Sequence, residues 1–152
     1  LAPFIAEKKL PVILMHKRGI PRVMQQDTGY RDAFAEVNDY LKARADYALA
    51  HGIADNKIIL DPGIGFGKDT GANCTLIRWC GTLCDGRYPV VMALSRKAII
   101  GDLTGRDVAD RLAGTITANV LAIIAGAAII RVHDVKEAVD SMAVLGGIGY
   151  NY

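Results

Sequence analysis

Four short and nearly continuous apolar runs recur along the chain, and they restrict its fold more than any other feature. They are PVILM (11–15), KIILD (57–61), PVVMAL (89–94) and AAIIRV (127–132). A strand with one face in water alternates apolar and polar residues, whereas a parallel strand covered on both faces reads as an unbroken apolar run. The four runs are therefore predicted to be parallel strands that other elements cover.

The segments between these runs have the spacing of helices. From residue 30 to 51 apolar residues recur every three or four positions, and Gly52 follows where a helix C-cap belongs. Further helices are predicted to begin near Asn73 as an N-cap, to open at Asp107, and to run from about 135 to 145, where two glycines would stop the last one. The chain thus reads as four consecutive (βα) units.

Four parallel strands with helical crossovers fit either an open doubly wound sheet or part of a (βα)₈ TIM barrel. A complete barrel needs about 250 residues, so 152 residues correspond to roughly half of one. Polar residues that could bind a ligand follow all four runs: His16 and Lys17; Asp61; Ser95, Arg96 and Lys97; Arg131, His133 and Asp134. In an open sheet only the strand ends near the switch point meet a ligand, whereas every strand end borders the mouth of a barrel. This distribution favours the barrel.

Composition narrows the functional classes. Hydrophobic residues make up 51% of the chain and charged residues 22%, which is typical of one globular domain. The net charge is +2 without a long run of either sign, so no footprint for nucleic acid or anionic lipid is present. The apolar stretch 120–130 is too short to span a bilayer.

The N-terminal sequence and the cysteines indicate where in the cell the protein is located. LAPFIAEKKLP has too brief an apolar run for a signal peptide, and it lacks an initiator methionine, so the chain is expected to be a fragment or a processed piece. Cysteine occurs three times, an odd number, with no histidine nearby to complete a metal set. We therefore expect reduced thiols in a cytoplasmic protein.

The stretch IILDPGIGFGKD (58–69) ends an apolar run with Asp61 and continues with three alternating glycines. It is not a nucleotide-binding motif: Lys68 replaces the third glycine of the dinucleotide fingerprint, and Pro62 and Asp69 break the Walker A pattern. Glycine nevertheless allows backbone conformations and close approaches that other residues exclude. From the residues alone, a ligand-binding loop and a structural turn both remain open.

In IIRVHDV, Arg131 and His133 are two residues apart and should project from the same face of a strand. A guanidinium beside an imidazole suits an anion or a flat ring, and Arg96 and Lys97 could join them around a phosphate or pyrophosphate. Arg131 could instead pair with an interior carboxylate such as Asp61. His16 likewise could either line the barrel mouth or be a satisfied structural histidine.

Three motifs in this order, LDPGIGFGKD (60–69), ALSRKAIIGDLTGR (93–106) and IIRVHDVKEA (129–138), resemble dihydropteroate synthase. LMHKRGIPRVMQ (14–25) is similar to a fourth segment of that family. The resemblance implies that residues 1–152 form a single partial pterin-binding barrel domain, with strands five to eight of the TIM barrel. SRK followed by RVHDV argues against the corrinoid methyltransferases, which share the barrel and are the closest alternative.

The resemblance also implies roles for individual residues. Asp61 would hydrogen-bond the amino group and ring nitrogen of the pterin, Lys97 would reach its ring oxygen and nitrogen, and Arg131 would stack on the ring; these three form the expected catalytic set. Phe66 would close the glycine-loop side and Met15 would supply an apolar wall. The groups expected to bind the anionic parts of the substrates are Ser95 for the 4-aminobenzoate carboxylate, and Arg96 and His133 for the pyrophosphate.

The implied reaction joins 6-hydroxymethyl-7,8-dihydropterin diphosphate to 4-aminobenzoate and releases pyrophosphate in folate biosynthesis. In the family Mg²⁺ assists the leaving group, and its main protein ligand would lie in the absent strands one to four, so no metal ligand is assigned here. A half-barrel has two open edges, which predicts a homo-oligomer or pairing with an N-terminal half. Ala93 stands where the family usually has glycine. Together with the missing strands, it supports the alternative of a non-catalytic pterin-binding or structural half-barrel module.

Overall fold

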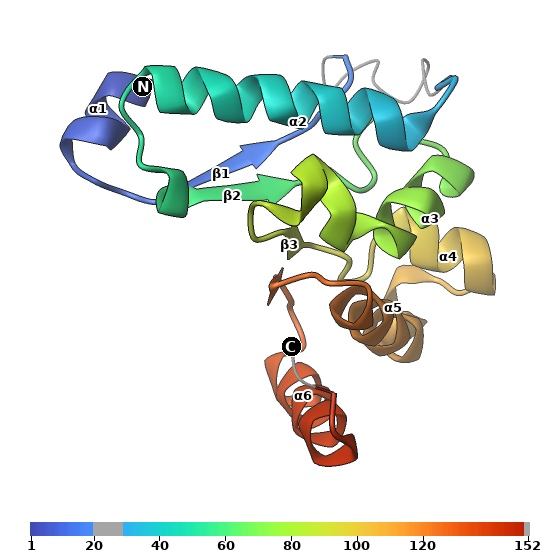
Figure 1. Ribbon diagram of the computed structural model, residues 1–152. Coiled ribbons are helices and arrows are strands. Elements are labelled where there is room, and N and C mark those ends of the chain that lie inside the picture. Colours follow the sequence, from blue (N-terminus) through green and yellow to red (C-terminus); the bar gives the residue numbers. More distant parts are fainter. Residues whose placement is uncertain (20–28, 151–152) are drawn as a thin grey trace.

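The computed structural model describes residues 1–19 and 29–150 (Figure 1). Residues 20–25, which belong to the LMHKRGIPRVMQ motif, lie outside the described residues. The strands are β1 (Val12–Met15), β2 (Ile58–Asp61), β3 (Val91–Met92) and β4 (Ile129–Ile130). The helices are α1 (Ala2–Glu7), α2 (Ala33–Ala50), α3 (Thr70–Arg78), α4 (Ala98–Thr104), α5 (Leu112–Ile124) and α6 (Val135–Ile148), with 3₁₀ turns η1 (Asp55–Lys57), η2 (Cys80–Gly86) and η3 (Val108–Asp110).

The four strands are parallel and stand in the order in which they occur in the chain. β1 pairs with β2 so that Met15 lies beside Asp61, and β3 pairs with β4 so that Val91 lies beside Ile129. A parallel bridge between residues 60 and 90 joins the two pairs. The predicted α/β architecture with parallel strands is confirmed, and its strand order shows no reversal of the kind that marks the switch point of a doubly wound sheet.

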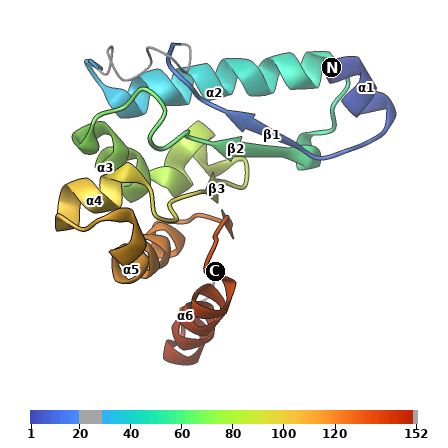
Figure 2. The same ribbon diagram turned by 180° about the vertical axis from the view of Figure 1, so that it is seen from behind.

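The strand register divides the sheet residues between two faces. On the face toward the helices, Leu60 and Met92 are fully buried, and α2 lies along β1 and β2 (Figures 1 and 2). On the other face, Ile13, Met15 and Ile129 keep 54%, 37% and 39% of their surface exposed. Burial of each large apolar side chain contributes about 1.5–3 kcal/mol, so the core lies between the helices and one face, and the opposite face is an uncovered apolar surface.

Helix α2 follows the predicted periodicity. Asp32 caps its N-terminus by accepting a 2.9 Å hydrogen bond from the amide of Ala35, and His51 is its C-cap residue, one position before the predicted Gly52. The residues of α2 that face the core are Val37, Leu41, Ala45 and Ala48. This stripe packs against β1 and β2 and against the neighbouring segments α3 and η2.

The predicted N-termini of α3 and α5 were wrong. The N-cap of α3 is Asp69, whose Oδ1 accepts from the amide of Ala72 at 2.7 Å, whereas Asn73 lies inside the helix. Both residue types cap helices well, so local preference could not distinguish them. Asp107 opens only the 3₁₀ turn η3, and the helix itself follows Arg111.

The prediction for the last helix also needs correction at its C-terminus. Helix α6 continues through Gly146 and Gly147 and ends at Gly149, which has φ +98°. A glycine ends a helix when it adopts this left-handed conformation, and a glycine that keeps helical angles only weakens the helix. Helices α1 and α4 were not predicted, because each spans only six or seven residues.

The structure also bears on membrane insertion and on the state of the cysteine thiols. Within the described ranges, no helix is both long enough and apolar enough to cross a membrane. The three cysteines are free; Cys80 and Cys84 are buried and Cys74 is half-buried. Burial raises the pKa of the Cys80 and Cys84 thiols, which keeps them protonated and unreactive.

Candidate active site

The carboxyl ends of the four strands bring the predicted polar residues to one side of the sheet. The backbone amide of His16, after β1, donates to the carbonyl of Asp61 at the end of β2 (3.0 Å). The amide of His133, after β4, donates to the Ser95 hydroxyl after β3 at 3.2 Å. Lys97, which precedes α4, reaches back to the glycine loop after β2. These contacts link all four strand ends into one candidate site.

Asp61 places a half-buried carboxylate at the centre of this side. Its Oδ1 accepts a 2.7 Å hydrogen bond from the amide of Gly63. Burial raises the pKa of the Asp61 carboxyl, while the Gly63 hydrogen bond and the charges of Lys97 and Lys68 act in the opposite direction. Within the described part of the chain no hydrogen bond occupies Oδ2, so one carboxylate oxygen can accept from a ligand.

The loop of residues 62–67 needs glycine for steric reasons. Gly63 has φ +68°, and a Cβ there would lie 1.8 Å from the carbonyl oxygen of His16. Gly65 has φ +82° and donates its amide to Oδ1 of Asn73 at 2.9 Å. The loop therefore packs closely against the end of β1 in a conformation that requires glycine.

Lys97 borders the same site as Asp61. Its Nζ donates to the carbonyl of Ile64 at 2.6 Å and lies 5.0 Å from the centre of the Phe66 ring. Burial lowers the pKa of the Lys97 amine, the nearby Asp61 carboxylate raises it, and Arg131 lowers it. The charges of Asp61 and Arg131 both act on Lys97, so the three expected catalytic residues lie in one electrostatic neighbourhood.

Arg131 is exposed, as are Met15 and His133. The ion pair between Arg131 and Asp61 that the sequence left open is not formed: among the described residues Arg131 makes no salt bridge. Its guanidinium is thus available to a ligand. With Met15 exposed at the end of β1 and Arg131 following β4, the site opens to solvent on the uncovered face of the sheet.

Arg96 is engaged with a neighbour that follows β4. Its Nε and Nη2 donate to the two carboxylate oxygens of Asp134 at 3.1 and 2.5 Å, a bidentate pair that lowers the pKa of the Asp134 carboxyl. Arg96 has φ +55°, a left-handed conformation. The hydrogen bond that its backbone amide donates to Thr115 Oγ1 helps to hold this conformation. Ser95 is buried, and its hydroxyl retains its own proton for donation.

His16 is a buried histidine. Its Nδ1 lies 2.9 Å from Nζ of Lys68, and its ring meets the Tyr40 ring edge-on at 4.9 Å. Burial and the charge of Lys68 lower the pKa of His16 to about 4, so the ring is neutral near pH 7. Of the two interpretations of His16, these contacts support the satisfied structural histidine.

Sequence reasoning missed three residues that hold the site loops in place. Lys68 Nζ donates to the carbonyl of Gly63, and Asn73 Oδ1 accepts from the amide of Gly65, so both side chains hold the glycine loop. Arg111 donates from Nη1 to the carbonyls of Arg96 and Lys97 at 3.1 and 3.3 Å, and a Cβ on Gly101 would collide with its guanidinium. Spacing gave no signal for these contacts, because each depends on the conformation of a loop and follows no helical or strand periodicity.

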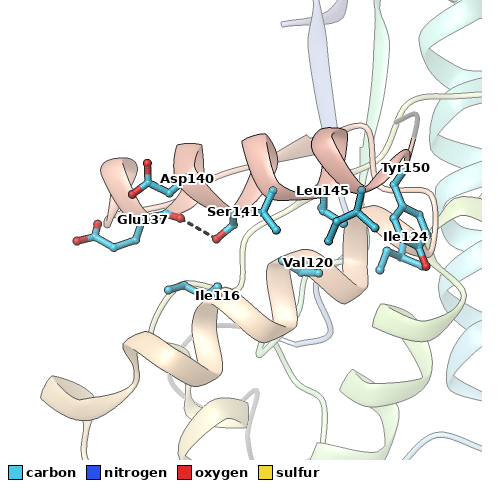
Figure 3. Close-up of a pocket in the computed structure, with 10 residues that line it drawn as sticks. Ile116, Val120, Ile124, Glu137, Asp140, Ser141, Leu145 and Tyr150 are labelled. Carbon is cyan, nitrogen blue, oxygen red and sulfur yellow. Dashed lines mark hydrogen bonds between the residues drawn. The ribbon is translucent and has the colours of Figure 1, made fainter.

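A separate apolar groove of about 570 Å³ lies between α5 and α6, away from the strand ends (Figure 3). Ile116, Val120 and Leu145 line it. At one end, the Ser141 hydroxyl donates to the carbonyl of Glu137 at 2.7 Å. None of the predicted site residues lines this groove.

Parallel strands whose carboxyl ends carry a carboxylate, a lysine and an arginine around a glycine loop define an α/β protein with a small-molecule site. The comparisons with known proteins specify the class. The sequence profile of the pterin binding enzymes matches residues 1–133, and the chain belongs to this family.

The most similar proteins include dihydropteroate synthases. The enzyme from Escherichia coli K12 is 43% identical over 140 residues, and that from Neisseria meningitidis serogroup C is 44% identical over 142. Both matches cover 92% of this chain and 50% of the relative. The family resemblance inferred from the motifs is confirmed, and the chain spans about half the length of these relatives.

Solved structures give the same result. The chain is similar to Xanthomonas albilineans dihydropteroate synthase with 4-aminobenzoic acid, with a TM-score of 0.90 and 38% identity over 99% of this chain and 54% of that one. The same enzyme in complex with 7,8-dihydropteroate has a TM-score of 0.89 and 37% identity, over 99% and 55% of the two chains.

Proposed function

We propose that this chain supplies the pterin-binding side of a dihydropteroate synthase. The reaction would join 6-hydroxymethyl-7,8-dihydropterin diphosphate to 4-aminobenzoate and release pyrophosphate. One observation carries the proposal: Asp61, Lys97 and Arg131, from the ends of three strands, share one neighbourhood beside a rigid glycine loop. The relatives solved with 4-aminobenzoic acid and with 7,8-dihydropteroate support the same substrate class.

The pterin would bind between these three residues. The Asp61 carboxylate would accept from the amino group and ring nitrogen of the pterin, using Oδ2 and the second lone pair of Oδ1, a charge-assisted pairing that requires the ionised form. Lys97 would exchange its bond to Ile64 for the ring oxygen and nitrogen. Arg131 would stack its planar guanidinium on the ring, with Phe66 and Met15 as apolar walls.

The anionic groups of the two substrates would meet the ends of β3 and β4. Ser95 would donate its hydroxyl proton to the 4-aminobenzoate carboxylate while it still accepts from the amide of His133. The exposed ring of His133 would contact the pyrophosphate. Arg96 would join it only by sharing its guanidinium with Asp134, since both of the bonds to that carboxylate are short.

The chemistry requires no side-chain nucleophile. The bond between the pterin methylene carbon and the diphosphate oxygen breaks with its electron pair on the leaving pyrophosphate. The amine nitrogen of 4-aminobenzoate then bonds to that carbon and loses a proton. The protein would accelerate these steps by positioning the two substrates and by stabilising developing charge.

Mg²⁺ is implied by the family resemblance and would stabilise the leaving pyrophosphate when bound. Across residues 1–19 and 29–150, no three His, Cys, Asp or Glu side chains are grouped to hold a metal ion. No step in this chain is assigned to the ion.

We further propose that residues 1–152 are one partial domain, the second half of a TIM barrel, and that four further (βα) units complete it. The uncovered apolar face at Ile13, Met15 and Ile129 would then be the barrel interior. The groove between α5 and α6 is a second apolar surface (Figure 3). The chain covers half of its relatives, which is the share that such a half would have. We place the protein in the cytoplasm, where its three free thiols would stay reduced.

The partner proposal is tested by light scattering after size-exclusion chromatography. We expect the chain alone to self-associate through its uncovered face, and to form a 1:1 complex when an N-terminal half of a family member is added. A stable, well-folded monomer that ignores the added half would contradict the proposal. A homodimer that the N-terminal half cannot dissociate would identify a second copy of this chain as the partner.

The activity is tested by pyrophosphate release with both substrates and Mg²⁺. We expect little release from the chain alone and recovery when the N-terminal half is added. The alternative function is a non-catalytic pterin-binding module, which the half-length match and Ala93 favour. Pterin binding without pyrophosphate release in the reconstituted complex would establish that alternative.

A further inference from the structure

Lys68 is a buried cation that the proposed chemistry does not use. Its residue is only 3% exposed, and its Nζ lies 2.9 Å from the carbonyl oxygen of Gly63, 3.1 Å from that of Phe66 and 2.9 Å from Nδ1 of His16. An ammonium group has three protons to donate, and these three acceptors use all of them. The side chain therefore points at the backbone of the glycine loop.

The loop is held at both of its ends by this one group. Gly63 and Phe66 stand at the two ends of the turn, and the Phe66 amide also donates to the Gly63 carbonyl at 3.1 Å. The main chain of Lys68 adds a further tie, because its carbonyl accepts from Nδ2 of Asn73 at 3.3 Å. Oδ1 of the same Asn73 accepts the amide of Gly65.

The atoms that Lys68 holds are directly connected to the proposed pterin contacts. The amide of Gly63 donates to Asp61 Oδ1, and the carbonyl of Ile64 accepts from Lys97. A shift of the loop would move the Gly63 amide, which is the partner of Asp61, and the Ile64 carbonyl, which is the partner of Lys97. Because hydrogen bonds weaken steeply with misalignment, a small displacement would redirect both side chains.

We propose that Lys68 is a positioning residue for the candidate site. By holding the glycine loop in place, it fixes the orientation of the Asp61 and Lys97 side chains. Its identification with a pterin site rests on the proposed function. The role needs a cation and not only a side chain of the right size, since three acceptors converge on one nitrogen.

Three charged or titratable groups face the Lys68 amine. His16 follows β1, Asp61 ends β2 and Lys97 precedes α4. Because the His16 ring is neutral near pH 7, its Nδ1 can accept a hydrogen bond from the ammonium. The positive charge of Lys68 in turn lowers the pKa of the Asp61 carboxyl. Removing Lys68 should therefore raise that pKa, both through the lost charge and through the loosened Gly63 bond.

The test compares the wild-type chain with Lys68→Met, which keeps the length of the side chain but cannot donate. The first measurement is amide hydrogen exchange of Gly65 and Phe66 without ligand, and the second is the pH dependence of pterin-analogue binding by calorimetry. Lys57→Met is the matched control, because it removes the same charge beside the opposite end of β2.

In Lys68→Met we expect both amides to exchange about 10-fold faster, since the hydrogen bonds of a charged group are lost. Binding falls off at low pH when Asp61 gains a proton, and the midpoint of this fall should move up by about one pH unit. Lys57→Met should match wild type in both measurements. A folded Lys68→Met variant with wild-type exchange and an unmoved midpoint would overturn the proposal.

Two further outcomes are distinguishable. If the wild-type chain binds no pterin analogue, the proposed function fails, and hydrogen exchange alone still decides whether Lys68 holds the loop. If Lys68→Met does not fold, Lys68→Gln takes its place, because it removes the charge but keeps a polar end group that can still donate a hydrogen bond to the loop carbonyls. We expect faster exchange of the two amides in that variant, and unchanged exchange would refute the role of the cation.

Discussion

Lys97 donates a 2.6 Å hydrogen bond from Nζ to the carbonyl oxygen of Ile64, and this bond joins the segment after β3 to the glycine loop after β2. The lysine is therefore already directed at the candidate site without a ligand. A bound pterin would replace the Ile64 carbonyl as the acceptor of the hydrogen bond that Lys97 donates. The bond makes Lys97 a tie between two loops, and the proposed function would make it a contact for the substrate as well.

Replacing Lys97 with methionine should weaken pterin-analogue binding by about 10-fold to 100-fold, because a hydrogen bond from a charged group is lost. Asp61 should also become easier to protonate, since the Lys97 charge lowers its pKa. Titration calorimetry at two pH values measures both effects. Lys136→Met, at the start of α6, removes an exposed charge and serves as the control. Equal affinity in Lys97→Met and Lys136→Met would rule out the assigned contact.

Asp61→Asn should abolish binding of a pterin analogue, because the amide cannot provide the paired acceptors that an ionised carboxylate offers. Folding should respond in the opposite direction. Burial raises the pKa of Asp61, so the ionised form is disfavoured in the folded state, and a neutral amide removes this penalty near pH 7. Urea denaturation should show equal or higher stability, with Asp39→Asn on α2 as control. Unchanged affinity in Asp61→Asn would refute its role.

Gly63→Ala should destabilise the fold more strongly than a positive φ alone can explain. The new Cβ would lie 1.8 Å from the carbonyl oxygen of His16. Gly105→Ala is the matched control, because it has φ +70° and no atom within 4 Å of the Cβ. We expect a loss of about 1–2 kcal/mol in the control and about 3 kcal/mol or more at Gly63, measured by urea denaturation. Similar losses would show that the loop can move away from β1.

The His16 ring should make stability depend on pH on the acidic side. Its pKa is about 4 in the folded chain against 6.5 for the free side chain, so below pH 6.5 the unfolded state takes up a proton that the folded state refuses. This contribution is present in full above pH 6.5 and is lost as pH falls toward 4, and it amounts to about 3 kcal/mol.

His16→Phe should flatten that part of the pH profile, measured by urea denaturation between pH 7 and pH 4. His51→Gln is the control, because His51 is an exposed C-cap residue whose Nδ1 contacts the Tyr47 carbonyl. A profile of His16→Phe that still falls as steeply as wild type would show that other groups carry the acid dependence.

The strands and the site motifs were predictable from the sequence because each depends on a local pattern. An apolar run such as PVVMAL is typical of a parallel strand, and a carboxylate after such a run emerges at the strand end. The stripe on α2 was legible for the same reason. The expected cover on both faces was wrong for this chain, because Ile13, Met15 and Ile129 are exposed on one face. The family motifs added the expected roles of Asp61, Lys97 and Arg131 without any knowledge of their distances.

Helix boundaries and supporting contacts depended on the tertiary structure. Asp69 and Asn73 have equal capping preferences, and only the packing of the loop directed Asn73 to the Gly65 amide. A lysine is normally a surface residue, yet Lys68 is buried, because three acceptors from two strand ends surround its nitrogen.

The sequence by itself determined which segments are strands, which residues stand at their carboxyl ends and which family the chain resembles, because these follow from burial patterns and from residue order. The tertiary structure alone decided that Arg96 pairs with Asp134, that Lys97 binds Ile64 and that Lys68 contacts His16. A hydrogen bond requires two groups within about 3 Å in a suitable direction. Residues 30 or more positions apart meet that condition only after the whole chain has packed.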